Sequence, residues 1–218
     1  MSFEGWEVES TQPTFEPGAV RLMDFRAPQH DGVAFLHTLP RTSPHALVEF
    51  TRISGSPAST SSESFLRVHL DLTLGVDGYR VLRRENGLLP LRPYLHRPRT
   101  AASLAVGTAA GMVKASTGYG YQLMRQDSAW LAHQLRDREA LSGLRRRHHH
   151  QAMDAVFLEL ALHDPATLAT SLELLFARNS ADLVLRFLSE ASTLTEEARL
   201  VSSLPVFPFL RAALRTLT

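Results

Sequence analysis

Residues 106–121 read VGTAAGMVKASTGYGY, a run of small residues between an apolar stretch and a predicted helix. The turn at 107–111 is small enough for backbone N–H groups to approach an anion at a helix N-terminus, where the helix dipole also favours negative charge. A dinucleotide pyrophosphate is a natural candidate for that anion. Taken alone, the pattern also fits an ordinary Gly-rich loop between a strand and a helix.

The first part of the chain is predicted to be mainly strands. These predicted strands are 20–25, 33–39, 46–53 and 79–84. Pro, Gly, His and Ser residues separate them, which is typical of an antiparallel sheet. A Ser-rich loop at 54–62 precedes a helical stripe of apolar residues at 65–72.

The second part is predicted to be mainly helices. Leu104 to Val106 is expected to be a buried strand that leads into the turn, followed by a helix from about Thr117 to Leu135. The apolar stripes of further helices lie within 153–160, 168–176 and 183–188, and a final short helix is predicted at 210–217. Asp164-Pro165 and Asn179-Ser180 are expected to end and cap helices.

Composition fits a folded domain and limits its chemistry. The 218 residues are 44% hydrophobic and 21% charged, with a net charge of +1 and no cysteine. Disulfides, thiolate metal sites and a cysteine nucleophile are excluded, and a cytoplasmic location is expected. The dispersed basic residues give no reason to expect nucleic acid as a partner. No apolar run approaches the ~20 residues of a spanning helix, so any membrane contact is expected to be peripheral.

The one compact basic run is 145–150, Arg-Arg-Arg-His-His-His. It is predicted to be a solvated helix face, with contact to anionic lipid head groups as the alternative. Contiguous histidines are expected to diverge around a helix, so no metal site is predicted.

Several segments match one family in order and spacing. They are Gly5-Trp6-Glu7-Val8-Glu9, Leu22-Met23-Asp24-Phe25-Arg26, Ala46-Leu47-Val48-Glu49-Phe50-Thr51, Glu85-Asn86-Gly87-Leu88-Leu89-Pro90, residues 106–121 and Ser203-Leu204-Pro205-Val206-Phe207-Pro208-Phe209-Leu210. Together they resemble the lycopene cyclases, flavin-dependent carotenoid enzymes, and in particular a bacterial subgroup with Val-Glu-Phe-Thr.

The resemblance implies an α/β (α+β) fold, the C-terminal part of a FAD-binding Rossmann-type flavoprotein. It divides the chain into substrate-domain strands at 1–100, a second FAD-contacting element with its helix at 101–140, and a helical cap at 141–218. Family members begin with a Gly-x-Gly-x-x-Gly turn for the adenosine half of FAD, and no such fingerprint occurs here. We therefore expect a truncated or split cyclase whose N-terminal half is supplied separately.

The implied activity is cyclisation of lycopene through gamma-carotene to beta-carotene, without net oxidation. Reduced FAD would be the cofactor and NAD(P)H its reductant. Glu49 matches the family's acidic motif, and a buried acid can hold a proton at neutral pH. Better-known members place a second acidic residue directly after the first, where this chain has Phe50. Neighbouring strand residues point to opposite faces, so Glu49 and Phe50 cannot both line one surface. The absence of the second acid therefore need not remove the proton donor. The alternative for Glu49 is a solvent-facing strand residue.

Glu85 is the second catalytic candidate, with an ordinary turn residue as the alternative. The predicted cofactor-binding residues are Gly107, Thr108, Ala109, Ala110, Gly111, Lys114, Ser116, Thr117, Gly118 and Tyr119. Lys114 is alternatively a surface cation and Tyr119 a packed aromatic residue. The implied partners are lycopene, a membrane surface that holds it, and the missing half. Alternative functions are an isoprenoid-directed flavoprotein reductase or hydroxylase, and a non-catalytic fragment or subunit.

Overall fold

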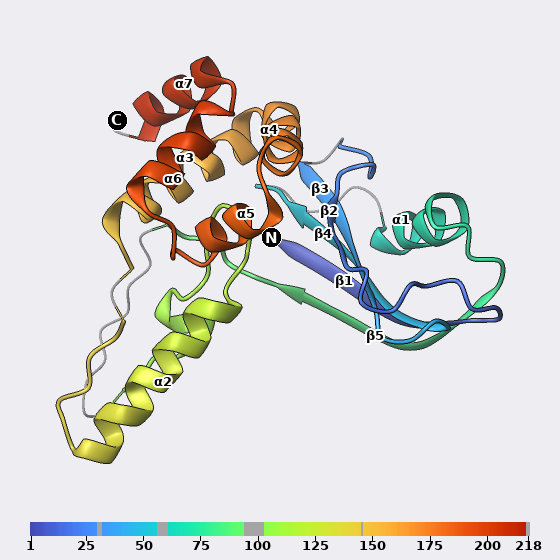
Figure 1. Cartoon of the computed structure of the whole chain (residues 1–218), viewed down its shortest axis with the longest axis horizontal. Helices are drawn as coiled ribbons and strands as arrows, with labels where there is room; N and C mark the ends of the chain where they lie inside the picture. The colour runs from blue at the N-terminus through green and yellow to red at the C-terminus, as the bar shows by residue number, and fades with distance from the viewer. Residues whose placement is uncertain (30–31, 56–60, 94–102, 145, 217–218) are drawn as a thin grey trace. The chain divides into compact units, whose positions relative to one another are not determined.

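The computed structural model describes residues 1–29, 32–55, 61–93, 103–144 and 146–216. It divides into two compact units, Met1–Leu88 and Leu89–Thr218 (Figure 1). The first unit is built on a sheet and the second on helices. The finer division predicted at residues 100 and 140 stays a prediction.

A five-stranded antiparallel sheet forms the first unit, with the strand order β2-β3-β4-β1-β5. The strands are β1 Ser2–Ser10, β2 Arg21–Asp24, β3 Val33–Pro40, β4 His45–Ile53 and β5 Tyr79–Leu88. The first strand of the chain therefore lies inside the sheet, hydrogen-bonded to β4 on one side and β5 on the other.

One face of this sheet is covered by helix α1, Ser62–Val68, which continues into a π-helical turn, His69–Thr73 (Figure 1). The core under the helix includes Trp6, Val48, Phe50 and Leu66, all at most 1% exposed. Because neighbouring strand residues point to opposite faces, the burial of Phe50 here places Glu49 on the face away from α1.

The predicted strands are confirmed with small shifts in their ends, and β5 extends to Leu88. The sequence prediction had no strand at the N-terminus, although β1 is central. The reason is that the apolar residues of β1 are few and divided between its faces: Trp6 and Val8 lie under α1, whereas Phe3 shares the other face with Gly5, Glu7 and Glu9.

The second unit contains six α-helices within its described residues. They are α2 Tyr121–Asp137, α3 His148–His163, α4 Pro165–Arg178, α5 Ala181–Leu188, α6 Leu194–Ser202 and α7 Val206–Thr216. The predicted caps are confirmed: Asp164 accepts from the Thr167 N–H and Ser180 from the Leu183 N–H. Helix α6 was not predicted, and it begins with a capping box of Thr193 and Glu196.

Two local predictions were wrong. Leu104 to Val106 is not a strand, and Leu104 and Val106 are 40% and 51% exposed, since so short an apolar run carries little strand information. The helix predicted from Thr117 begins only at Tyr121, because Gly118 has a φ of 76°, outside helical geometry.

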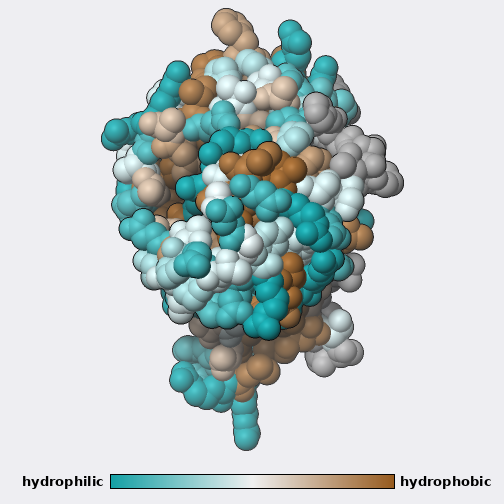
Figure 2. All heavy atoms as spheres, turned by 90° about the vertical axis from the view of Figure 1, so that its right-hand side faces the viewer, coloured by the Kyte–Doolittle hydropathy of each residue, from teal (hydrophilic) through white to brown (hydrophobic). Residues whose placement is uncertain are grey.

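Surface hydropathy and helix length both bear on contact with a membrane. The face of the molecule in Figure 2 is mainly hydrophilic, with separate apolar patches. Within the described part of the chain, every helix is too short or too polar to cross a bilayer.

The sheet core generates a first prediction. Phe50 stacks on Phe65 with ring centroids 4.9 Å apart and is 1% exposed. Phe50→Ala should lower the free energy of unfolding of the first unit by about 3–5 kcal/mol, because it leaves a cavity under α1. Urea denaturation followed by circular dichroism measures this loss. Leu88→Ala is the control, since Leu88 is 83% exposed; equal losses in both variants would contradict the assigned core.

Candidate functional site

Both glutamates singled out from the sequence lie in one row across the face of the sheet opposite α1. The strand register aligns His37 of β3 with Glu49 of β4, Glu49 with Gly5 of β1, and Gly5 with Glu85 of β5. Directly paired residues point to the same side of a sheet. At the usual strand spacing, the backbones of Glu49 and Glu85 lie about 10 Å apart with Gly5 between them.

Gly5 lets the side chain of Glu85 lie across β1. A Cβ atom at Gly5 would come within 3.1 Å of Glu85 Cγ and 3.2 Å of Glu85 Oε1. The Glu85 carboxylate therefore leans over the glycine toward β4. Sequence reasoning did not place Gly5 in the site, although an isolated glycine between Trp6 and Glu4 in a strand is a known signal of close approach.

Glu49 is half-buried and hydrogen-bonded on its own face. The Thr51 hydroxyl donates to Glu49 Oε1 at 2.9 Å. Burial raises the pKa of Glu49 above its ordinary value, the nearby charge of Glu85 adds to this rise, and the Thr51 hydrogen bond opposes it. Burial is the largest effect, so the structure favours the protonated form of this acid.

Glu85 has a different environment. Its Oε2 accepts a hydrogen bond from Arg83 Nη2 at 2.9 Å, and both side chains are partly exposed. An arginine partner in water stabilises the charged form of a carboxylate. The row thus combines a half-buried acid whose pKa is raised with a partly exposed carboxylate that is paired with Arg83.

His37 borders Glu49 on the other side and was not predicted as a site residue. Its Nδ1 accepts the backbone N–H of Met23 at 3.1 Å, and its ring meets Phe35 edge-on at 5.2 Å. Burial lowers the pKa of His37 to about 4. The ring is therefore neutral at pH 7, with its proton on Nε2.

In the second unit, the predicted cofactor turn is formed by small residues. Gly107–Ala110 is a 3-10 turn, and Gly107 and Gly111 have φ angles of 57° and 77°. A Cβ atom at Gly107 would meet only Met124 Sδ, at 3.9 Å. The turn is accessible at Gly107, Thr108 and Ala109, whereas Ala110 and Gly111 are buried. The cofactor-binding role of these five residues stays a prediction.

Lys114 and Ser116 are directed into the protein. Lys114 is 0% exposed, and its Nζ lies 3.1 Å from Asp154 Oδ1 and 3.7 Å from Glu190 Oε1. The alternative of a surface cation at Lys114 is therefore wrong. Ser116 donates to Asp154 Oδ1 at 2.5 Å.

The segment continues with Thr117, whose hydroxyl accepts a hydrogen bond from the Tyr119 N–H at 3.3 Å.

Arg146 completes this buried ion cluster of Lys114, Arg146, Asp154 and Glu190. Its Nη2 donates to Asp154 Oδ2 at 2.5 Å, it also pairs with Glu190, and its Nη1 donates to the Val113 carbonyl at 3.1 Å. The prediction of a solvated face for the basic run is wrong at Arg146, which is 8% exposed, and at His150, which is 0% exposed. Besides Asp154, the carboxylates next to them are Glu190 and Glu197, which lie far away in sequence.

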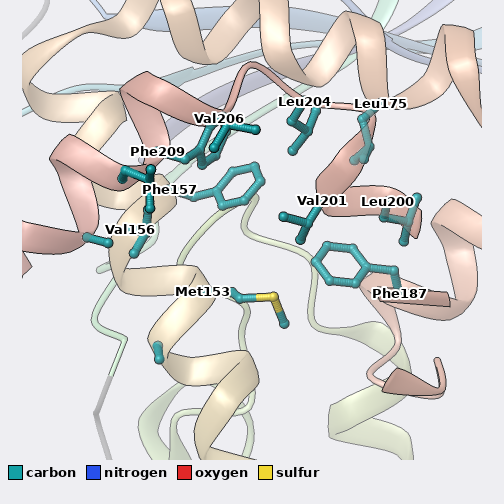
Figure 3. A pocket seen from close by; sticks show the side chains of 13 residues that line it. Met153, Val156, Phe157, Leu175, Phe187, Leu200, Val201, Leu204, Val206 and Phe209 are labelled. Carbon is teal, nitrogen blue, oxygen red and sulfur yellow. The ribbon is translucent and has the colours of Figure 1, made fainter. Parts of the chain in front are cut away.

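An apolar cavity of about 300 Å³ lies among the helices of the second unit (Figure 3). Its walls include Met153, Phe157, Leu175, Phe187, Val201 and Phe209. All its lining residues are apolar, so it offers neither an acid nor a base. The glutamate row is therefore the better candidate for chemistry.

Comparison with known proteins gives the fold and then the family. The fold is similar to that of a geranylgeranyl bacteriochlorophyll reductase-like protein from Thermoplasma acidophilum, with a TM-score of 0.52 and 11% sequence identity. The match covers 96% of this chain and 53% of that one, so this chain spans about half its length. The predicted class, a mixed α/β fold with an antiparallel sheet followed by helices, is confirmed, and it matches part of that structure.

The model of the family described as lycopene cyclase protein matches residues 1–214. The chain therefore belongs to the lycopene cyclase family. No curated protein sequence matches it significantly.

The environment of Glu49 predicts a pH-dependent stability. Because the folded chain has the raised pKa, it binds this proton more tightly than the unfolded chain, and ionisation of Glu49 lowers the free energy of unfolding as pH rises. Glu49→Gln removes that ionisation. The variant should therefore gain stability relative to the wild type as pH rises above about 4, the ordinary pKa of a glutamate, measured by urea denaturation.

Glu63→Gln is the matched control for this experiment. Arg67 and Arg84 lower the pKa of Glu63, so its ionised form stabilises the folded chain and its loss should act in the opposite direction at neutral pH. Parallel pH curves for the wild type and Glu49→Gln would contradict the buried environment assigned to Glu49.

The buried ion cluster predicts a large effect at Lys114. Lys114→Ala leaves Asp154 and Glu190 with Arg146 as their remaining cation in the cluster, and should lower the free energy of unfolding of the second unit by about 3–5 kcal/mol. Arg136→Ala, which removes an exposed pair with Asp137, should have a much smaller effect. Thermal unfolding compares the two, and a similar small shift in both would show that the cluster contributes little.

Proposed function

We propose that this chain forms the substrate-domain and second flavin-contacting part of a FAD-dependent lycopene beta-cyclase. The observation that carries the proposal is the row of Glu49, Gly5 and Glu85 in a member of the lycopene cyclase family. In this row a half-buried acid with a raised pKa and a second carboxylate share the face of the sheet opposite α1.

Cyclisation needs an acid and a site for a cation. In the proposed reaction Glu49 gives its proton to a terminal double bond of lycopene, and the neighbouring alkene attacks the resulting cation to close the ring. A carboxylate of the row, Glu85 or the deprotonated Glu49, accepts a ring proton as the new double bond forms, so the reaction is an isomerisation with no net oxidation. The raised pKa of Glu49 supports the first step, because the acid is protonated more often at neutral pH than an exposed glutamate.

Glu85 is proposed to assist from across Gly5. Its negative charge raises the pKa of Glu49 and favours a cation held over the same face of the sheet. His37, neutral and held by the Met23 N–H, is proposed to keep Glu49 in position rather than to donate the proton. Its low pKa leaves it without an acidic proton to give at pH 7.

FAD is proposed to be held at the open turn of the second unit. Gly107, Thr108, Ala109, Ala110 and Gly111 would contact it through the backbone, and Thr117, Gly118 and Tyr119 would continue the contact. When bound in its reduced form, with NAD(P)H as reductant, FAD supplies negative charge that stabilises a cationic transition state without net electron transfer. Lys114 and Ser116 are proposed to position the turn through Asp154 instead of contacting the cofactor.

The remaining partners follow from this chemistry. Lycopene is apolar and resides in membranes, so we propose peripheral contact with a membrane surface from the cytoplasm. The adenosine half of FAD is proposed to be bound by a separate Gly-x-Gly-x-x-Gly segment that completes the enzyme.

Product identification in lycopene-accumulating cells tests the proposal. The chain is expressed with a coding sequence that supplies the N-terminal half, and carotenoids are separated by chromatography. The intact pair should form beta-carotene. Glu49→Gln should reduce cyclisation by about 10²- to 10⁴-fold, as expected for loss of a general acid, and Glu85→Gln by a smaller factor.

Glu63→Gln serves as the control, because Glu63 is exposed on the helix-covered side of the sheet. It should leave the yield unchanged. Full cyclisation by Glu49→Gln would remove the proton-donor role, and a hydrogenated or hydroxylated product would favour the reductase or hydroxylase alternative. Unchanged lycopene with the intact pair would contradict the cyclase proposal.

A further inference from the structure

Two adjacent histidines converge on one carboxylate in the helical unit, contrary to the expected divergence around the helix. His149 Nε2 lies 3.1 Å from Glu197 Oε2, and His150 Nε2 lies 3.1 Å from Glu197 Oε1. The two rings are tilted by 32° with centroids 4.5 Å apart. Helix α3 supplies the histidines and α6 the glutamate, so the cluster joins two helices of the same unit.

These nitrogens lack the hydrogen bonds that burial requires. Among the residues described, His149 Nε2 and both ring nitrogens of His150 have no hydrogen-bond partner, despite their closeness to Glu197. His150 is 0% exposed and Glu197 5% exposed. Unpaired buried polar atoms are unfavourable, so this arrangement calls for a further group between the rings and the carboxylate.

We infer that His149, His150 and Glu197 form a binding site for a divalent transition-metal ion such as Zn²⁺. One ligand atom from each residue lies within 4.8 Å of the others. Ligand atoms of a tetrahedral zinc site are about 3.3 Å apart for bonds near 2.0 Å. Here each imidazole nitrogen lies 3.1 Å from one oxygen of the carboxylate, Oε2 for His149 and Oε1 for His150, so an ion between them would bind Glu197 through one oxygen or both. Two imidazole nitrogens and one carboxylate oxygen are a common zinc ligand set.

The surroundings hold this ligand set in place. Ser192 Oγ donates to Glu197 Oε1 at 3.0 Å, and the Arg147 guanidinium donates to the Ser192 carbonyl at 3.2 Å. Hydrogen bonds to a ligating carboxylate fix its orientation. The side chain of His149 is 38% exposed although its Nε2 is buried, so the cluster lies close to the surface of the helical unit.

The nearby cationic side chains do not prevent a metal ion from binding at this site. Lys114 is paired with Asp154 and Glu190, and Arg147 Nη1 is 3.9 Å from Glu197 Oε1. A divalent ion would replace Arg147 as the principal partner of Glu197. The site is independent of the cyclisation proposal, since it lies in the helical unit and involves neither of the catalytic candidates.

Metal titration of the 218-residue chain tests the inference without any activity measurement. Chelator-treated protein is titrated with Zn²⁺ against a chromophoric zinc indicator, and bound metal is counted by elemental analysis. One ion per chain should bind more tightly than about 10 μM. His149→Gln and Glu197→Gln should weaken binding by at least about 100-fold, while far-UV circular dichroism shows that both variants are folded.

His133→Gln is the matched control, because His133, Asp137 and Glu139 form an exposed group of the same residue types. It should bind Zn²⁺ like the wild type. Absence of one-to-one binding, binding that survives His149→Gln in a folded variant, or binding lost in His133→Gln would each overturn the assignment. His149 is the partly exposed ligand, so its substitution tests the site with the least disturbance of the core.

Discussion

The position of β1 between β4 and β5 is the constraint on which the candidate site depends. It brings Gly5 to lie directly between Glu49 and Glu85, residues that are far apart in the sequence. A side chain larger than hydrogen at this position would meet Glu85, so the glycine permits one carboxylate to lean toward the other. The same strand buries Trp6 and Val8 under α1 and thereby sets which face of the sheet carries the glutamate row.

The second unit depends on a different interaction, the buried ion cluster of Lys114, Arg146, Asp154 and Glu190. Two cations and two anions approach one another from a turn, from the start of α3 and from the end of α5. Charges this deeply buried are tolerated only as pairs, which fixes their partners and so the path of the chain. Lys114 and Ser116 both contact Asp154, so the segment that follows the glycine-rich turn is attached to helix α3.

Sequence patterns predicted most helices and strands but few of the contacts between them. The alternation at 46–53 correctly indicated that Glu49 and Phe50 face opposite ways, and the structure places Phe50 under α1. Conversely, the Arg-His run looked like a solvated surface, since nothing local shows that Glu190 and Glu197 will cover Arg146 and His150. His37 gave no signal either, because its burial and its bond to the Met23 N–H come from strand pairing.

What the sequence alone determined was local or came from family resemblance. Period and cap residues define α4 and α5, and the collinear motifs identify the lycopene cyclase family, which the match over residues 1–214 confirms. Only the tertiary structure decided the row of Glu49, Gly5 and Glu85, the burial of Lys114 and the convergence of His149 and His150 on Glu197. The physical reason is that register, burial and charge pairing depend on residues distant in the chain, whereas helix and strand patterns depend on near neighbours.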